Sequence, residues 1–331
     1  MGTLVPPGEV DRHASSKRDR GHHGAVTQPA GTSGAEARWQ GRVVVGTDGS
    51  PGAEAAIAWA AREAGEHGRP LTLARAVPLP ILTAGIGPVG PAGFEIAEEL
   101  REAAVSELRV TMASLAVPDA QVHVEVGSPV GMLLEASREA SLIVVGSRGL
   151  GGFRGLLLGS TAAQIGPHAG CPVVIVRGDG SIAPEGVVVG VDGSEASYAA
   201  LAFAFAEASH HGVHLTVVHA WELPTYDLLV VPDDYYPWSI DALADDEHRL
   251  AAEVLAGFRD DYPDVVVRTL VVRGRPADVL LRTVGDHGLL VVGTHGRGPV
   301  MGAVLGSVSH SVLHRASGPV AIVPAKAPEW S

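Results

Sequence analysis

The sequence predicts an α/β protein of two tandem domains, each a doubly wound parallel sheet of five strands in the order 3-2-1-4-5. Short runs of aliphatic and β-branched residues alternate with Ala-rich amphipathic stretches, which is typical of βαβ units. This alternation occurs twice along the chain. Both copies also carry one glycine spacing, Gly-x2-Gly-x9-Gly-Ser, which starts at Gly146 and again at Gly293, about 147 residues later.

Other segments repeat in the same order as the glycines. Residues 43–50 read VVVGTDGS and residues 187–194 read VVVGVDGS. Likewise, CPVVIV at 171–176 is matched by GPVAIV at 318–323. Because the matches fall at both ends of the repeat, they indicate that the chain is a tandem duplication.

The length agrees with this organisation, because 331 residues are enough for two domains that each bury their own core. We predict a polar, disordered tail over residues 1–38, a first domain over 39–178 and a second domain over 184–325. The tail has no apolar segment of the kind that a secretory signal needs.

Composition narrows the classes of function. The formal net charge of −13 argues against a nucleic-acid-binding surface, and no apolar stretch is long enough to predict a membrane span. A single cysteine, Cys171, excludes an intramolecular disulfide and fits a reducing cytoplasm. We interpret that cysteine as a small buried hydrophobic residue.

The first half of repeat one reads as strand, helix, strand, helix. Residues 42–47 form an apolar strand, and 51–65 a helix with proline in its first turn. A second strand covers 71–77. After a Pro/Gly-rich loop, a helix is predicted whose apolar face carries Ile96, Leu100, Ala104, Leu108 and Met112.

The second half continues the alternation. Residues 121–126 alternate like a strand, and Ser128 and Pro129 are typical of the cap and first turn of a helix that runs to about Ala140. Strands at 142–145 and 173–176 then enclose the glycine loop and a helix from Ser160. The second repeat follows the same order.

The predicted topology places the repeated glycine spacing at a ligand crevice, which opens between the carboxyl ends of strands 1 and 4. Asp48 ends strand 1 and Gly146 ends strand 4. Glycines would let the backbone approach phosphate oxygens, and Ser160 could donate a hydroxyl hydrogen bond at the helix start. Alternatively, the glycines only make tight turns and the serines only cap helices.

The charged residues of the crevice also have two interpretations. Asp48 and Asp192 could hold a ribose hydroxyl or a magnesium ion, or could simply be turn residues in an Asp-Gly-Ser sequence. Arg148 and His295, inside the two glycine loops, could face phosphate or could be solvated loop residues.

The combination resembles the universal stress protein family, in its ATP-binding subgroup, from about residue 42 to 324. The family marks are an Asp that ends strand 1, the spacing G-x2-G-x9-G-[S/T] after strand 4 and an apolar last strand, and both repeats carry all three. The resemblance implies a Rossmann-like fold of the adenine nucleotide alpha hydrolase kind, with the two last strands paired. It also implies one ATP per repeat, two per chain, with Mg²⁺, and base contacts by Ala76 and Ala220.

The predicted nucleotide sites therefore comprise strand ends, glycine loops and helix starts. In the first repeat they are Gly46, Asp48, Ala76, Gly146, Arg148, Gly149, Gly159, Ser160 and Thr161, and in the second they are Gly190, Asp192, Ala220, Gly293, His295, Gly296, Gly306, Ser307 and Val308.

The resemblance implies a cytoplasmic regulatory protein in stress response, dormancy or growth control, which could pair as a homodimer and be read by an unidentified protein partner. The rival hypothesis is a slow ATPase that uses the same crevices, but no lysine is near them to stabilise transition-state charge. We interpret the pairs His210–His211 and His310/His314 as polar helix histidines, although the second has metal-ligand spacing. An aromatic segment at 221–238 could be a lid, a partner surface or simply packing.

Overall fold

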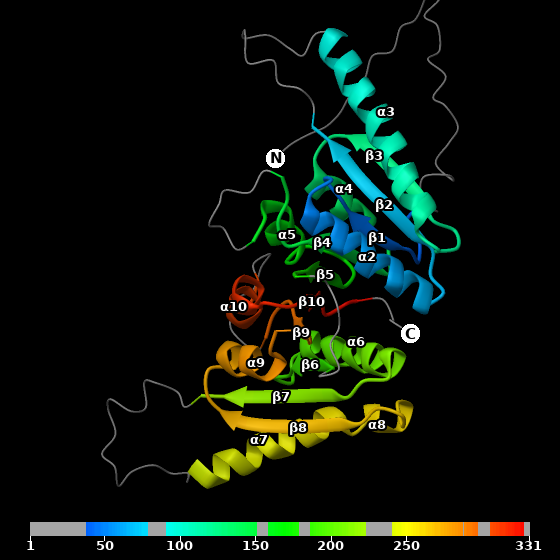
Figure 1. Cartoon of the computed structure of the whole chain (residues 1–331). Helices are drawn as coiled ribbons and strands as arrows, with labels where there is room; N and C mark the ends of the chain where they lie inside the picture. The colour runs from blue at the N-terminus through cyan, green and yellow to red at the C-terminus, as the bar shows by residue number, and fades with distance from the viewer. Residues whose placement is uncertain are drawn as a thin grey trace, which may run out of the picture. The chain divides into compact units, whose positions relative to one another are not determined.

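The computed structural model describes residues 38–78, 91–150, 158–178, 186–222, 240–286, 288–296 and 305–327, with no side-chain detail for 91–92 and 240–243. Within these ranges the two repeats share one sheet of ten strands (Figure 1). The strand order is β3-β2-β1-β4-β5-β10-β9-β6-β7-β8. Each half therefore has the predicted order 3-2-1-4-5, and the second half runs in the opposite direction across the sheet.

The first repeat alternates strands and helices as predicted. Its elements are β1 (Val43–Gly46), α2 (Pro51–Glu66), β2 (Leu71–Val77), α3 (Pro91–Ser114), β3 (Gln121–Val126), α4 (Pro129–Ala136), β4 (Leu142–Gly146), α5 (Ser160–Ile165) and β5 (Val173–Val176). All four strand pairings inside this repeat are parallel. The helices begin where the sequence predicts caps: Ser50 and Ser128 accept N–H groups of Ala53 and Gly131.

The second repeat copies this order and adds one short helix. Its elements are β6 (Val187–Gly190), α6 (Glu195–His211), β7 (Leu215–Trp221), α7 (Ile240–Leu255), α8 (Phe258–Asp261), β8 (Val267–Arg273), α9 (Pro276–Val284), β9 (Leu289–Gly293), α10 (Ser307–Arg315) and β10 (Val320–Val323). Its strand pairings are parallel as well.

The two repeats meet at an antiparallel joint between β5 and β10. Val174 pairs with Ala321, and on either side Ile175 pairs with Val320 and Val173 with Ile322. This register is symmetric about its central pair, as a pseudo-twofold axis requires. Every residue of both strands is buried. The pairing of the last strands that the family resemblance implies is confirmed.

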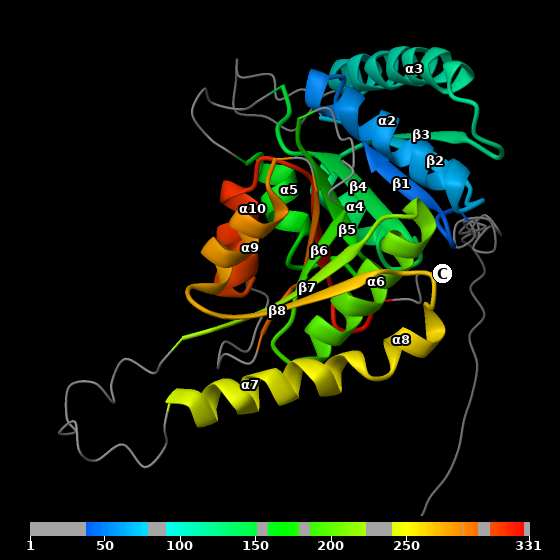
Figure 2. The ribbon, with the colours of Figure 1, turned by 60° about the horizontal axis from the view of Figure 1, so that its bottom comes forward.

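Helices cover both faces of the sheet and enclose two apolar cores. Residues of α2, α3, α6 and α7 form one core, in which Trp59 and Phe203 are the largest fully buried side chains. Residues of α4, α5, α9 and α10 form the other core, and Figure 2 shows α5, α9 and α10 close together on that face. In the described part of the chain no helix is long and apolar enough to cross a membrane.

Two sequence predictions differ from the structure. On α3, Ala104 and Leu108 are buried, but Ile96 and Leu100 are 40% and 47% exposed. The helix has 24 residues, about 36 Å, whereas the seven residues of β2 span about 23 Å, so the helix extends past the strand that it covers. Helix α4 ends at Ala136 rather than near Ala140, because the backbone N–H groups of Arg138 and Glu139 donate to carbonyl oxygens three residues earlier instead of four. The Ser137 hydroxyl there accepts the N–H of Gly170 at 3.0 Å.

The N-terminal boundary also has a contact that the sequence did not suggest. Arg38, the last residue of the predicted tail, donates from Nη2 to Glu135 Oε1 at 2.6 Å. Its carbonyl oxygen accepts from the Gln121 side chain at 2.9 Å.

Candidate nucleotide site

Each half of the sheet ends in two adjacent loops, one after the first strand and one after the fourth. Because β1 and β4 are parallel neighbours, Asp48 and Gly146 lie at the same edge of the sheet, and Asp192 and Gly293 do so in the second repeat. The loop after the first strand passes directly into α2 or α6. The structure thus produces the predicted crevice twice.

The aspartate of the first crevice connects its two loops. One carboxylate oxygen, Oδ1, accepts the Ser50 N–H at 3.0 Å, and the other, Oδ2, accepts the Leu150 N–H of the glycine loop at 2.7 Å. Burial favours the neutral acid, but the hydrogen bonds from Ser50 and Leu150 outweigh it and hold the pKa of Asp48 below its usual range. Asp48 is therefore ionised at neutral pH.

The second crevice has the same turn. Asp192 Oδ1 accepts the Ser194 N–H at 3.0 Å, and the Ser194 side chain caps α6 by accepting the Ser197 N–H. Both aspartates therefore act as turn residues, which was one of the two interpretations from the sequence. This observation does not decide whether they also bind a ligand.

The glycines of the loops are needed because the chain packs closely there. A Cβ on Gly149 would lie 2.2 Å from Asp48 Oδ2, and a Cβ on Gly296 would lie 2.3 Å from Asp192 Oδ2. A Cβ on Gly146 would lie 2.6 Å from the Gly52 carbonyl oxygen. These separations are far below a normal van der Waals contact, so only glycine fits these positions.

A second pair of glycines precedes the short helices after the loops. Gly159 N–H donates to Ser147 O at 2.7 Å, and Gly306 N–H donates to Thr294 O at 2.8 Å. Neither glycine can cap the following helix with a side chain. The first-turn N–H groups of α5 and α10 are therefore without a side-chain cap, as an anion-binding helix start requires.

The predicted site residues lie together in two hollows. The nine residues predicted for the first repeat all line a hollow of about 490 Å³, and the nine predicted for the second all line a hollow of about 310 Å³. Both volumes suit a small molecule. The structure thus brings each set together, while the contact of its members with a nucleotide stays a prediction.

One wall of each hollow was not predicted. In the first repeat Met132 and Leu133 of α4 line it, and in the second Leu280 of α9 does so. A Cβ on Gly46 would lie 2.9 Å from Leu133 Cδ1, and one on Gly190 would lie 3.0 Å from Leu280 Cδ1. The absence of a side chain on the glycine that ends each first strand therefore leaves room for these leucines. The presence of glycine at this position in both repeats was the sequence signal that could have predicted the apolar wall.

A polar side chain on the second strand supports each crevice and was also missed. Arg75 donates to the Asp48 carbonyl oxygen at 2.7 Å and pairs with Glu107 at 2.8 Å. At the equivalent position in the second repeat His219 lies 2.8 Å from the Val191 carbonyl oxygen through Nδ1. Its Nε2 lies 2.5 Å from Glu247 Oε2.

The histidine predictions have different outcomes. His310 and His314 contact each other, with ring centroids 4.5 Å apart, and no group of three candidate metal ligands among the described residues includes them. His211 lies on helix α6, as predicted, but its side chain is only 10% exposed and lies between Glu63 and Glu207. Of the aromatic segment 221–238, all but residues 221 and 222 lie outside the described residues.

Comparisons with known proteins agree with this architecture. The sequence pattern of the Universal stress protein family matches residues 41–177 and 185–324. A universal stress protein of Mycolicibacterium smegmatis is 36% identical over 288 residues, which cover 85% of this chain and 96% of that protein. One from Mycobacterium tuberculosis is 37% identical over 300 residues, which cover 86% of this chain and 97% of that protein.

A solved structure agrees in fold. The crystal structure of a universal stress protein from Archaeoglobus fulgidus has a TM-score of 0.61, with 22% sequence identity, and the match covers 86% of this chain and 97% of that chain. Two family matches along the sequence, relatives of similar length and a shared fold lead to one conclusion: the chain belongs to the universal stress protein family and contains two of its domains in tandem.

Proposed function

We propose that this protein is a nucleotide-dependent regulator that binds one ATP with Mg²⁺ in each hollow, two per chain. The observation that carries the proposal is the convergence of all nine predicted residues of each repeat on one hollow at the carboxyl edge of the sheet. The role in stress response, dormancy or growth control follows from the family. So do a cytoplasmic location, pairing as a homodimer and a protein partner that reads the bound state.

The lining of each hollow has both kinds of surface that an adenine nucleotide requires. Part of it is apolar, with Ala76 and Leu133 in the first repeat and Ala220 and Leu280 in the second. An adenine ring would lie against these side chains. Another part offers glycine backbone and a helix start with uncapped N–H groups, which suit phosphates.

Asp48 and Asp192 give each hollow a negative group beside the glycine loop. An ionised Asp48 could accept a ribose hydroxyl or face a magnesium ion held by the phosphates. Mg²⁺ prefers oxygen ligands and would supply positive charge that offsets phosphate repulsion. Arg148, which also lines the first hollow, would add to that charge.

The same residues favour binding over turnover. Among the described residues that line the hollows, the only carboxylates are Asp48 and Asp192, and no lysine is present. Both oxygens of Asp48 already accept backbone N–H groups, so this carboxylate is poorly placed to activate water. Slow ATP hydrolysis is the alternative that the experiment below tests.

The joint between the repeats offers a route from occupancy to regulation. Ser147, next to the first glycine loop, donates its N–H to the carbonyl oxygen of Val176 at the end of β5, and Thr294 does the same to Val323 at the end of β10. Both phosphate loops are therefore bonded to the strands that join the repeats. A free ATP concentration of 100 times the dissociation constant stabilises the bound state by about 2.7 kcal/mol, and these hydrogen bonds would pass part of that effect to the joint.

Calorimetry with ATP and Mg²⁺ on the full chain tests the proposal. We expect two equivalents of ATP for the wild type and one for Asp48→Ala or Asp192→Ala, because each variant loses the turn that holds its glycine loop. Mass spectrometry of nucleotide released from freshly purified protein should show adenine nucleotide. Wild-type protein that is folded, empty and unable to bind ATP would refute the proposal.

Phosphate release by the same three proteins separates binding from hydrolysis. If the protein is a regulator that does not hydrolyse ATP, we expect no phosphate release above background. A rate that falls in both aspartate variants would instead support the ATPase, whereas an equal rate in all three would indicate a contaminating enzyme.

A further inference from the structure

Two helix ends meet on one face of the sheet, and each carries a glutamate and a histidine four residues apart. Glu63 and His67 lie at the end of α2, and Glu207 and His211 lie at the end of α6. Glu63 and Glu207 are 144 residues apart, as are the two histidines and the two crevice aspartates. The pseudo-twofold axis that relates the repeats therefore relates the two Glu-x3-His pairs.

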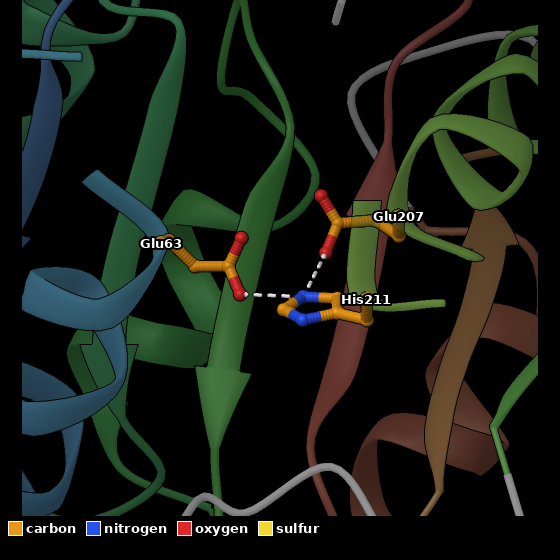
Figure 3. Close-up of side chains that lie close together, drawn as sticks. All are labelled: Glu63, Glu207 and His211. Atoms are coloured by element: carbon orange, nitrogen blue, oxygen red, sulfur yellow. Dashed lines mark hydrogen bonds and ion pairs between the residues drawn. The ribbon is translucent and has the colours of Figure 1, made fainter. Parts of the chain in front are cut away.

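The four side chains converge and are almost completely buried. Both glutamates have no exposed side-chain surface, and His67 and His211 are 4% and 10% exposed. Figure 3 shows Glu63 from α2 facing Glu207 and His211 from α6. One ligand atom from each of Glu63, Glu207 and His211 lies within 4.8 Å of the other two.

The side chains are close enough for one ion to contact ligand atoms from both repeats. His211 Nε2 lies 3.0 Å from Glu63 Oε1, within hydrogen-bond distance, and 3.5 Å from Glu207 Oε2. His67 Nε2 lies 3.4 Å from Glu63 Oε2 and 3.7 Å from Glu207 Oε1. With metal–ligand bonds of about 2.0–2.1 Å, neighbouring ligand atoms around a tetrahedral Zn²⁺ lie about 3.3 Å apart.

The surroundings also suit a metal ligand. A histidine that binds a metal through one ring nitrogen usually donates from the other to a carboxylate or carbonyl. His211 Nδ1 lies 3.2 Å from Glu66 Oε2. The His67 ring stacks on His210, with centroids 3.8 Å apart and an interplanar angle of 18°, which fixes its orientation.

Two buried carboxylates require positive charge beside them. The titratable groups that face this place are Glu63, Glu66, His67, Glu207, His210 and His211. Protonated imidazoles would supply that charge, and so would one divalent ion with neutral imidazoles.

We propose that Glu63, Glu207 and His211 bind one divalent transition-metal ion of the Zn²⁺ type between the two repeats, with His67 beside the site. Two carboxylates and an imidazole form the mixed oxygen and nitrogen set that Zn²⁺ accepts and that Mg²⁺ and Ca²⁺ do not favour. The ion cross-links α2 to α6. This site is separate from both nucleotide hollows.

Titration of the metal-free full chain tests the site in the wild type, without a mutation. Chelator-treated protein, kept free of nucleotide, receives Co²⁺ and then Zn²⁺. We expect one saturating equivalent per chain, with visible absorption bands of tetrahedral Co²⁺ that Zn²⁺ abolishes.

Variants then assign the ligands. Glu207→Gln keeps the shape of the side chain but removes its charge, and we expect it to weaken binding at least about 100-fold. His310→Ala/His314→Ala, which removes the other helical histidine pair, is the matched control and should keep full affinity.

Two results would overturn the proposal: no saturable binding by folded wild type, or binding that the His310/His314 variant loses and Glu207→Gln keeps. If Glu207→Gln does not fold, the wild-type stoichiometry and the Co²⁺ absorption bands still decide. A wild type that binds no metal would show that the four groups form an ion-pair network between protonated imidazoles and carboxylates.

Discussion

The two hollows share one backbone but differ in the side chain that supports it. In the first repeat a positively charged Arg75 donates to the Asp48 carbonyl oxygen and pairs with Glu107. In the second, His219 contacts the carbonyl oxygen one residue earlier, on Val191, and its partner is Glu247. The loops differ as well, with Arg148 in one and His295 in the other.

Comparing equivalent positions of the two repeats shows which positions require one residue type and which accept several. The glycines whose Cβ would collide with the crevice aspartate, Gly149 and Gly296, occur in both repeats, and so does the pair Gly146 and Gly293, where a Cβ would lie 2.6 Å and 2.8 Å from backbone. Other closely packed glycines do not recur, since Gly52 is matched by Ala196. Positions that only need a hydrogen-bond donor toward a carbonyl oxygen accept either an arginine or a histidine. We therefore expect both repeats to bind the same class of ligand, with different affinities.

The largest expected effect comes from the glycine that faces each aspartate. Gly149→Ala places a Cβ where Asp48 Oδ2 now accepts the Leu150 N–H, so the loop and the carboxylate must separate. We expect ATP affinity of the first site to fall at least about 100-fold, and Gly296→Ala to do the same to the second. Calorimetry should then find one equivalent of ATP for each variant.

Gly65→Ala is the matched control for that pair. Gly65 lies in α2 and a Cβ there meets no atom within 4 Å. The substitution should leave both sites intact and stabilise the helix by up to about 1 kcal/mol. If Gly149→Ala keeps two equivalents at wild-type affinity, close packing of the loop on Asp48 has no part in binding.

An intermediate effect should come from the supports beneath the crevices. His219 is 5% exposed, and its loss leaves the Val191 carbonyl oxygen without this contact, so we expect His219→Ala to cost about 2–3 kcal/mol of unfolding free energy. Arg75→Ala should cost only about 1 kcal/mol, because Glu107 is largely exposed. Urea denaturation measures both.

The exposed His248, next to Glu247 on α7, is the control for the second support. His248→Ala should change the unfolding free energy by less than about 0.5 kcal/mol. Equal costs for Arg75→Ala and His219→Ala would mean that burial does not distinguish the two supports.

The smallest effect concerns the start of β5, where the first repeat has Cys171 and the second has Gly318. Burial raises the pKa of the Cys171 thiol to about 12, so almost no thiolate exists in the folded chain. We expect iodoacetamide at pH 8 to label the native protein at least about 100-fold more slowly than the protein in urea. Mass spectrometry counts the label, and rapid native labelling would show that the start of β5 opens.

The sequence predicted the sheet well because its inner strands are buried on both faces. Strands β4 and β5 read as continuous aliphatic runs, and glycine or proline marks the ends of most elements. The crevice could be predicted for the same reason, since strand order alone fixes which loops are neighbours. The apolar face of α3 could not, because periodicity does not reveal how far a helix extends beyond its sheet.

The Glu-x3-His pairs could not be interpreted from the sequence for a different reason. Glu63 and His211 are 148 positions apart and meet only because β5 and β10 pair in one particular register. Each pair alone is typical of a solvated helix end. The sequence did contain one signal, because the Glu-x3-His spacing occurs at equivalent positions in both repeats. Equivalent residues meet in the folded chain only where they lie near the pseudo-twofold axis.

The joint between β5 and β10 also has a consequence for how the two repeats can diverge. A domain that pairs with an identical copy must keep a surface that complements itself, and every substitution then appears on both sides. Here each last strand is already occupied by its covalently attached sister, at an effective concentration that no free domain would match. The two hollows are thus present in a fixed ratio of one to one, and either can change its lining while the other keeps its own.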